Sequence, residues 1–400
     1  MKKTEDPAGD FLRGLFFAFG IAQRQQLSWA CWRILLRLFP LPQQKIQLPQ
    51  YRGKFFERGD GILYGFFQES KHGIRVAAAL VLAVLLCAGT MAGAVEVKPR
   101  MLVPVGHTVG IKLFSKGVLV VKLPTESTPA KECGLQTGDV IVKCGGVTVD
   151  STEQFRAILQ SCGESATDLQ VQRRGRPITL SVAPEQNEQG DYAIGAWIRD
   201  SMAGIGTVTY YDPATGDFGA LGHGIADVDT AMLMPFSSGS ILPSSVKAVK
   251  RGSAGDAGEL RGEFDLKNDI GSLWSNTNQG VFGTVEVRPE EWHQEALPVA
   301  GREEVKEGPA TILSNVQGDE VREYAVEILR VAEHAADNRN LVISVTDPDL
   351  MATTGGIVQG MSGSPIIQDG KLVGAVTHVL VNDPTRGYGI FIENMLDAAG

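Results

Sequence analysis

The chain has 400 residues, of which 43% are hydrophobic and 21% are charged, so it is long enough for two or three folded domains. Its formal net charge of −9 provides no basic field of the kind that nucleic acids bind, and we exclude a nucleic-acid partner. The five cysteines contain no CxxC pair and the six histidines no HExxH motif, so we predict neither a metal nor any other cofactor.

The first predicted element is a transmembrane signal-anchor over residues 76–95, which carry no charge. Twenty such residues cross a hydrocarbon core of about 30 Å. Twelve Lys and Arg against six Asp and Glu precede it, which places the N-terminus in the cytosol and residues from 96 onward outside. A cleaved signal peptide is the alternative, because Ala92-Gly93-Ala94 is similar to a cleavage site. The extension 1–70 either lies partly in the membrane interface or results from a start set too far upstream.

Residues 101–185 are predicted to form a small, mostly β domain. Alternating runs broken by glycine predict its strands, and residues 151–160 predict a helix capped by Ser151. The order STPAKECGLQTGDVIV, then GGVTV, the helix and VQRRG resembles a PDZ domain of the bacterial protease-associated kind. That resemblance implies a groove that takes an extended peptide by strand addition, lined here by Val109, Gly110 and Ile111. The alternative is a packing module that only positions the next domain.

Residues 190–400 are rich in short β runs and glycine turns, and about 210 residues of this kind fit a two-barrel β domain. Only Glu320–Ala336 fits either a helix or a strand. Within it, residues 359–367 read QGMSGSPII, where Gly360 and Gly363 flank a serine that a turn can expose. With the hairpin that follows, this stretch resembles the chymotrypsin clan of serine proteases. The resemblance implies that Ser362 is the nucleophile and that the amides of Gly360 and Ser362 form the oxyanion hole.

A nucleophilic serine needs a base and a group that orients it. In the clan the histidine comes first, in a glycine-rich turn, and FGALGHGIAD places His223 there; His378, in the strand after the serine, is the main competitor. Asp347 keeps the order His, Asp, Ser and is the predicted third member. Asp227 and Asp229, close to His223, are the alternatives, and a turn-forming Asp-Pro is the ordinary role of Asp347.

Together, GALGHGIAD, TDPDL and the long run from QGMSGSPII to GYGIFIE, behind a membrane segment and a PDZ domain, closely resemble the SpoIVB peptidases of endospore-forming bacteria. The resemblance implies a mainly β fold: a membrane-anchored PDZ domain followed by a chymotrypsin-like double β-barrel serine protease domain. It also implies a single-pass protein of the forespore membrane whose two domains face the intermembrane space and which self-cleavage releases. Its substrates would be itself and the extracytoplasmic part of a regulatory protein that restrains an intramembrane protease, whose release triggers processing of pro-sigma-K. A non-catalytic PDZ scaffold and a general envelope quality-control protease are the alternatives.

Overall fold

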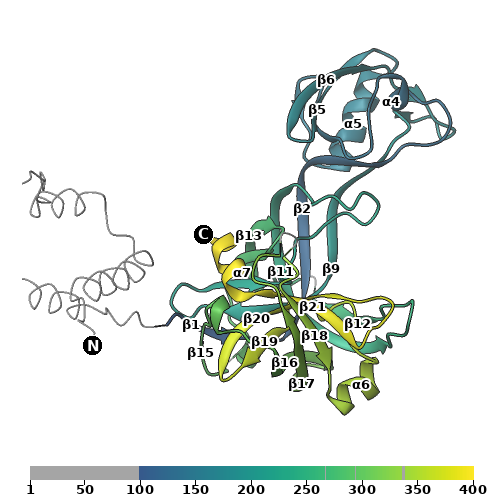
Figure 1. Ribbon diagram of the computed structural model, residues 1–400. Coiled ribbons are helices and arrows are strands. Elements are labelled where there is room, and N and C mark those ends of the chain that lie inside the picture. The colour runs from purple at the N-terminus through teal and green to yellow at the C-terminus, as the bar shows by residue number, and fades with distance from the viewer. Residues whose placement is uncertain (1–98, 266, 293, 336–337) are drawn as a thin grey trace, which may run out of the picture. The chain divides into compact units, whose positions relative to one another are not determined.

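The computed structural model describes residues 99–400 apart from residues 266, 293, 336 and 337 (Figure 1). All of them belong to one compact unit, Glu96–Gly400. The extension 1–70 and the span 76–95 lie outside the described residues, so both remain predictions. In the described part, no helix combines the length and the apolar character that crossing a membrane requires.

Six strands form the first barrel of a fold that is mainly β. β9 (Trp197–Tyr211), β10 (Asp217–Ala220), β14 (Gly280–Val285), β13 (Gly271–Thr277), β11 (Phe236–Lys250) and β2 (Thr108–Lys122) follow one another in the sheet, and β2 pairs back onto β9. β1 (Met101–Pro104), β12 (Glu259–Phe264) and β15 (Leu297–Pro298) extend it, and the short 3-10 helix η1 (Glu290–Trp292) precedes β15. Alternate side chains of these strands, among them Val109, Val208, Phe218 and Val281, fill its core.

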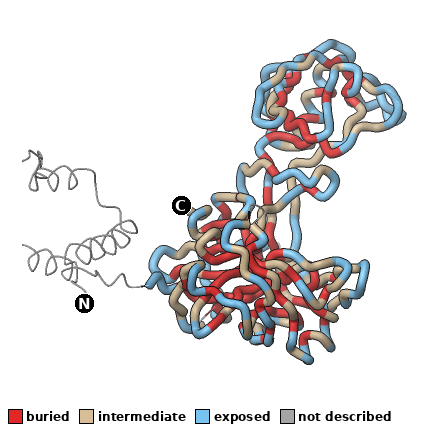
Figure 2. The backbone as a smooth tube through the Cα atoms, in the orientation of Figure 1, coloured by how far each residue is buried: buried red, intermediate tan, exposed pale blue. Residues whose placement is uncertain are grey.

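The second barrel is closed and contains β16 (Gly308–Gln317), β17 (Glu320–Val331), β18 (Leu341–Val345), β21 (Arg386–Phe391), β20 (Lys371–Val379) and β19 (Pro365–Gln368) in that order. Its interior is an aliphatic cluster that includes Ile312, Ile343 and Ile366, and buried residues, red in Figure 2, run along its strands. Two helices, α6 (Pro348–Thr354) and α7 (Ile392–Ala399), and the 3-10 helix η2 (Arg302–Glu304) complete this part. The predicted double barrel is therefore present, and the stretch from residue 320, which fitted either helix or strand, is β17.

The PDZ domain is inserted into the first barrel between β2 and β9, which run side by side into it (Figure 1). It contains β3 (Val140–Cys144), β4 (Val147–Thr148), β5 (Thr167–Arg173), β6 (Arg176–Val182), β7 (Glu185–Gln186), β8 (Tyr192–Ala193), α4 (Pro129–Glu132) and α5 (Thr152–Cys162). Ser151 caps α5 by accepting a hydrogen bond from Gln154 N, as predicted. The predicted boundaries need two corrections. β1 and the first half of β2 belong to the first barrel rather than to the PDZ domain, and the PDZ domain continues past residue 185 through β8.

Candidate active site

Two consecutive turns carry the predicted nucleophile. Met361 N donates to Val358 O and Ser364 N donates to Met361 O, so Gly360 and Gly363 each occupy the third position of a turn. Both glycines have a φ of 99°, a region that side chains rarely allow. A Cβ at Gly363 would also collide with the carbonyl oxygen of Thr207. The glycines that flanked Ser362 in the sequence are thus required by backbone conformation and close packing.

The same turns leave two amides available at the place predicted for an oxyanion hole. The amides of Met361, Gly363 and Ser364 all donate to backbone carbonyls. Within the described residues, no hydrogen bond uses the amide of Gly360 or that of Ser362. Both residues line the cavity described below, where unpaired donors are suited to a developing oxyanion.

Ser362 itself is half-buried, and its Oγ donates to the carbonyl oxygen of Thr377 in β20 at 2.7 Å. Its neighbour Ser364 is fully buried, and its Oγ donates to Ser314 Oγ at 3.1 Å. Ser364 therefore has a structural role, whereas Ser362 reaches a cavity that a substrate can enter.

The predicted base follows β10 in a constrained turn. Leu221 has a φ of 70° although it carries a bulky side chain, and its amide donates to Thr207 O at 3.1 Å. Two residues later, Nδ1 of His223 lies 2.9 Å from the carbonyl oxygen of Gly224. Because a carbonyl oxygen can only accept, Nδ1 carries the hydrogen and Nε2 keeps its lone pair. Burial lowers the pKa of His223, an effect that the hydrogen bond to Gly224 partly offsets. The imidazole is therefore neutral at pH 7 and in the tautomer that a base needs.

A single cavity of about 530 Å³ brings His223 and Ser362 together. Its lining comes from both barrels and contains the aliphatic side chains Ile111, Ile205, Leu221, Ile225, Val228, Ile357, Val358, Val379 and Val381. Among the described residues that line it, none is Asp, Glu, Lys or Arg. His378 also lines it, and its ring centroid lies 4.9 Å from that of His223. His378, the alternative base, therefore lies beside His223 in the same cavity and does not replace it.

Thr207, a fully buried residue of β9, joins the turn that carries Ser362 to the turn that carries His223. Its Oγ1 donates to Gly360 O at 2.8 Å and its amide donates to Ser362 O at 3.0 Å. Its carbonyl accepts from Leu221 N, two residues before His223. One strand of the first barrel therefore sets the nucleophile turn of the second barrel against the base turn of the first.

The structure does not bring Asp347 to His223. Asp347 is the N-cap of α6, where Oδ1 accepts from the amides of Asp349 and Leu350 and Oδ2 accepts from Ala325 N at 3.3 Å. It is not among the residues that line the cavity. The capping role matches the Asp-Pro sequence, since proline suits the first turn of a helix. In this arrangement the Gly224 carbonyl, rather than the predicted carboxylate, orients the imidazole.

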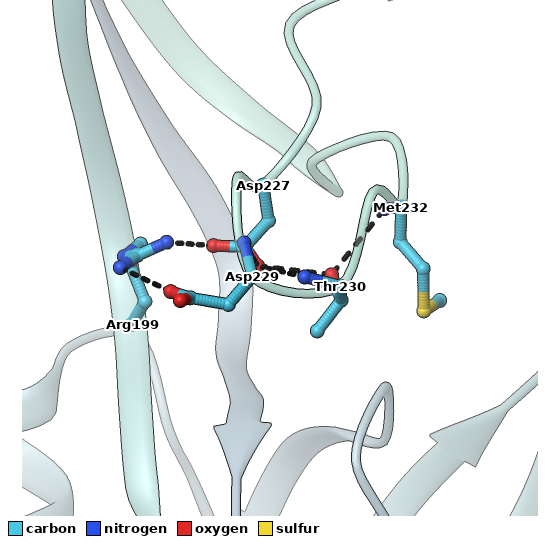
Figure 3. Close-up of polar contacts among 5 residues, drawn as sticks. All are labelled: Arg199, Asp227, Asp229, Thr230 and Met232. Carbon is cyan, nitrogen blue, oxygen red and sulfur yellow. Dashed lines mark hydrogen bonds and ion pairs between the residues drawn. The ribbon is translucent and has the colours of Figure 1, made fainter.

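The alternative carboxylates are also engaged elsewhere. Asp227 is 1% exposed, and its Oδ1 accepts from Asp229 N and from both the amide and the hydroxyl of Thr230. Its Oδ2 forms an ion pair with Arg199, as does the Oδ2 of Asp229 (Figure 3). Both carboxylates shape the loop after His223 and neither contacts its ring.

The predicted peptide groove needs a correction. Val109, Gly110 and Ile111 lie in β2 within the first barrel, paired with β9 on one side and with β11 on the other. A peptide cannot add to a strand whose two edges are already hydrogen-bonded. Ile111 instead contributes to the wall of the cavity that His223 and Ser362 line. The prediction failed because alternation identifies a strand but not the domain to which it belongs.

Sequence reasoning missed Thr207, Arg199 and the Thr377 carbonyl. Each contacts a residue outside its own element. The separation in sequence is 153 residues between Thr207 and Gly360, 28 between Arg199 and Asp227, and 15 between Thr377 and Ser362. A buried threonine in a strand carries no local sign of such a role. The sequence did contain one hint. Asp227 and Asp229 are two residues apart, and aspartates at such positions often form turns in which the carboxylate accepts from the backbone amide two residues later.

Two segments of the chain match models of known protein families. Residues 190–396 match the family model described as SpoIVB peptidase S55, and residues 120–173 match that of a PDZ domain. A Clostridium perfringens (strain 13 / Type A) protein named "Putative zinc metalloprotease CPE1693" is 32% identical over 69 residues, which cover 17% of this chain and only 21% of that relative.

Two of the solved structures to which parts of the chain are similar are a PDZ domain and a protease. The PDZ domain of the SdrC-like protein of Listeria monocytogenes is 19% identical, with 21% of this chain and 87% of that chain covered and a TM-score of 0.19. The active form of the Rv3671c protease of M. tuberculosis is 15% identical, with 50% and 75% covered and a TM-score of 0.29.

Proposed function

The chain belongs to the SpoIVB peptidase S55 family, whose model covers residues 190–396, and from this premise we propose that it is a serine endopeptidase. Ser362 is the nucleophile and His223 its base. The observation that carries the proposal is the cavity that His223 and Ser362 both line, beside the two unpaired amides of Gly360 and Ser362. A turn with only a structural role does not require unpaired amides or a neutral histidine on the other side of a cavity.

The mechanism is acyl transfer. Ser362 Oγ turns from the Thr377 carbonyl to Nε2 of His223, gives up its proton there and attacks the peptide carbonyl. Such hydrogen bonds are often looser before substrate binds. The tetrahedral oxyanion accepts hydrogen bonds from the amides of Gly360 and Ser362. His223 then returns the proton to the leaving amine, and water releases the acyl group by the same route.

The substrate follows from the cavity and from the family. An uncharged, aliphatic lining favours apolar side chains next to the scissile bond. The family resemblance and the uncharged segment 76–95 support a protein anchored in the forespore membrane that acts in the intermembrane space, during sporulation. There it would cleave itself and the extracytoplasmic segment of a membrane regulator, and so trigger intramembrane proteolysis of pro-sigma-K.

Fluorophosphonate labelling of the full-length protein tests the peptidase proposal. Wild type and Ser364→Ala should react, because the Ser364 hydroxyl donates to Ser314 and is not part of the proposed chemistry, whereas Ser362→Ala and His223→Ala should not react. Loss of either member of such a pair costs on the order of 10⁶ in turnover. Folded wild-type protein that does not react would instead favour a non-catalytic scaffold, in which Ser362 keeps its bond to Thr377.

A further inference from the structure

The loop that follows His223 is a small hairpin held at its base. Asp227 N donates to Met232 O, and Met234 N donates to Ile225 O. The side chain of Asn276 in β13 accepts from Ile225 N and donates to the carbonyls of Ile225 and Met234. The Asn276 contacts hold the two ends of the hairpin, and Asp227 and Asp229 lie between those ends.

Arg199 of β9 adds two ion pairs to this loop, in which Asp227 Oδ1 already accepts hydrogen bonds from Asp229 and Thr230 (Figure 3). Nη1 donates to Asp227 Oδ2, and Nη2 donates to Asp229 Oδ2 at 2.9 Å. The carboxylate of Asp227 is fully buried. Among the described residues, Arg199 is the only cation that pairs with it. A buried carboxylate that loses its partner is strongly unfavourable, and the loop would have to move to expose it.

The position of Arg199 connects this loop to the PDZ domain. Arg199 pairs with Leu119 where β2 and β9 enter that domain, and the next residue, Asp200, accepts a hydrogen bond from Thr152 N at the start of α5. Met232, in the same loop, also approaches the PDZ domain, because its sulfur would lie 2.6 Å from a Cβ added at Gly138. The loop that follows His223 is thus held by β9, the strand that also accepts a hydrogen bond from the start of the PDZ helix α5.

We propose that Arg199 is a positioning residue for His223: its two ion pairs hold the loop that starts at the base, and so keep Nε2 directed at Ser362. The inference rests on the proposed peptidase function. It assigns the PDZ insertion a part in the chemistry, because any shift of β9 at Arg199 reaches the base through Asp227.

The test is Arg199→Gln in the full-length protein, with fluorophosphonate labelling measured over a range of probe concentrations. The maximal labelling rate should fall about 10- to 100-fold, because an error of about 1 Å in a catalytic group costs up to about 10²-fold. The half-saturating probe concentration should change less than about threefold, since the binding cavity stays intact. Arg199→Lys should recover part of the rate, because an ammonium neutralises Asp227 but cannot bridge both carboxylates.

The pH profile separates positioning from mere stability. Burial lowers the pKa of His223, and a loosened loop lets water reach the ring, so the acid limb of labelling should move upward toward about 6.5. His378 on β20 is the other titratable side chain facing His223, and the cavity lining has no Asp, Glu, Lys or Arg among its described residues. An added His378→Gln change that leaves the shift in place assigns it to His223.

Arg173→Gln is the matched control. Arg173 forms an equally buried ion pair with Asp139 inside the PDZ domain, with side-chain exposures of 22% and 1% against 29% and 0% for Arg199 and Asp227. It should label at the wild-type rate with an unmoved acid limb. If Arg199→Gln does not fold, Asp229→Asn decides instead, because that carboxylate is half-exposed and its loss opens only the outer ion pair.

The outcomes separate cleanly. Slower labelling with a raised acid limb in Arg199→Gln or Asp229→Asn, but not in Arg173→Gln, supports the inference. A wild-type rate and acid limb, or equal slowing in both arginine variants, overturns it while the peptidase proposal stands. Wild type that fails to label although folded overturns the peptidase proposal, and this inference with it.

Discussion

Replacing Thr207 by valine tests whether one strand aligns the two catalytic turns. Valine keeps the shape of threonine in this fully buried position and removes only the hydroxyl that donates to Gly360 O. The lost hydrogen bond costs about 1 kcal/mol, which lowers the Tm by about 2–4 °C in a domain of this size. The larger effect should be on the reaction. Removing an oxyanion donor costs about 10²- to 10³-fold, and loosening the turn that carries Gly360 should cost about 10-fold.

The same strand contains a matched control. Thr209 is also fully buried, and its hydroxyl is one of two buried side-chain polar atoms without a hydrogen-bond partner in the described part of the chain. Thr209→Val removes an unpaired polar group, so its Tm should stay the same or rise, and labelling should not change.

Labelling rates and thermal melts of the two variants decide the matter. The explanation requires Thr207→Val to react about ten times more slowly than Thr209→Val and to melt at a lower temperature. Equal labelling by both variants would show that the Gly360 turn does not depend on Thr207 for its geometry.

Three further predictions concern the same site. Labelling should fall as pH drops through the pKa of His223, with a midpoint below about 6.5 because burial disfavours the imidazolium; a midpoint at or above that value would contradict the neutral-base assignment. Gly363→Ala should abolish labelling because its Cβ meets the Thr207 carbonyl, whereas Gly370→Ala, with a φ of 73° and open space, should remain active; an active Gly363→Ala would refute the turn geometry. Val381→Asp, at a cavity-lining side chain that is 48% exposed, should shift cleavage of a peptide library toward basic residues, and the exposed Val287→Asp outside that cavity should not; identical cleavage patterns would rule out Val381 as a specificity residue.

Local pattern was sufficient for those parts of the fold in which sequence neighbours act together. The cap of α5 needs only Ser151 and Gln154, three residues apart, and the nucleophile turns need only glycines at the positions with positive φ. Both were predicted from the sequence. β17 was ambiguous by periodicity and became a strand because β16 and β18 pair with it on either side.

Partner choice was the part that the sequence did not reveal. β2 is fifteen residues long, and its first half pairs in a protease barrel while its second half pairs with β3 in the PDZ domain. Both halves are rich in buried apolar residues, so the sequence pattern could not show that the domain boundary falls inside one strand. Asp347 shows the same limit, because chain order fitted a triad member while its neighbours Pro348 and Leu350 made it a helix cap.

The proposed catalytic pair consequently depends on how the two barrels meet, since Ser362 and His223 lie in different barrels. Thr108 of β2 donates to Asn315 Oδ1 of β16 at 2.6 Å, and Ser244 of β11 donates to Thr108 Oγ1 at 3.2 Å. These side chains are buried, so their hydrogen bonds are protected from water and fix one relative placement of the barrels. Since β2 and β9 also carry the inserted PDZ domain, the strands that support the insertion are the strands that align the base with the nucleophile.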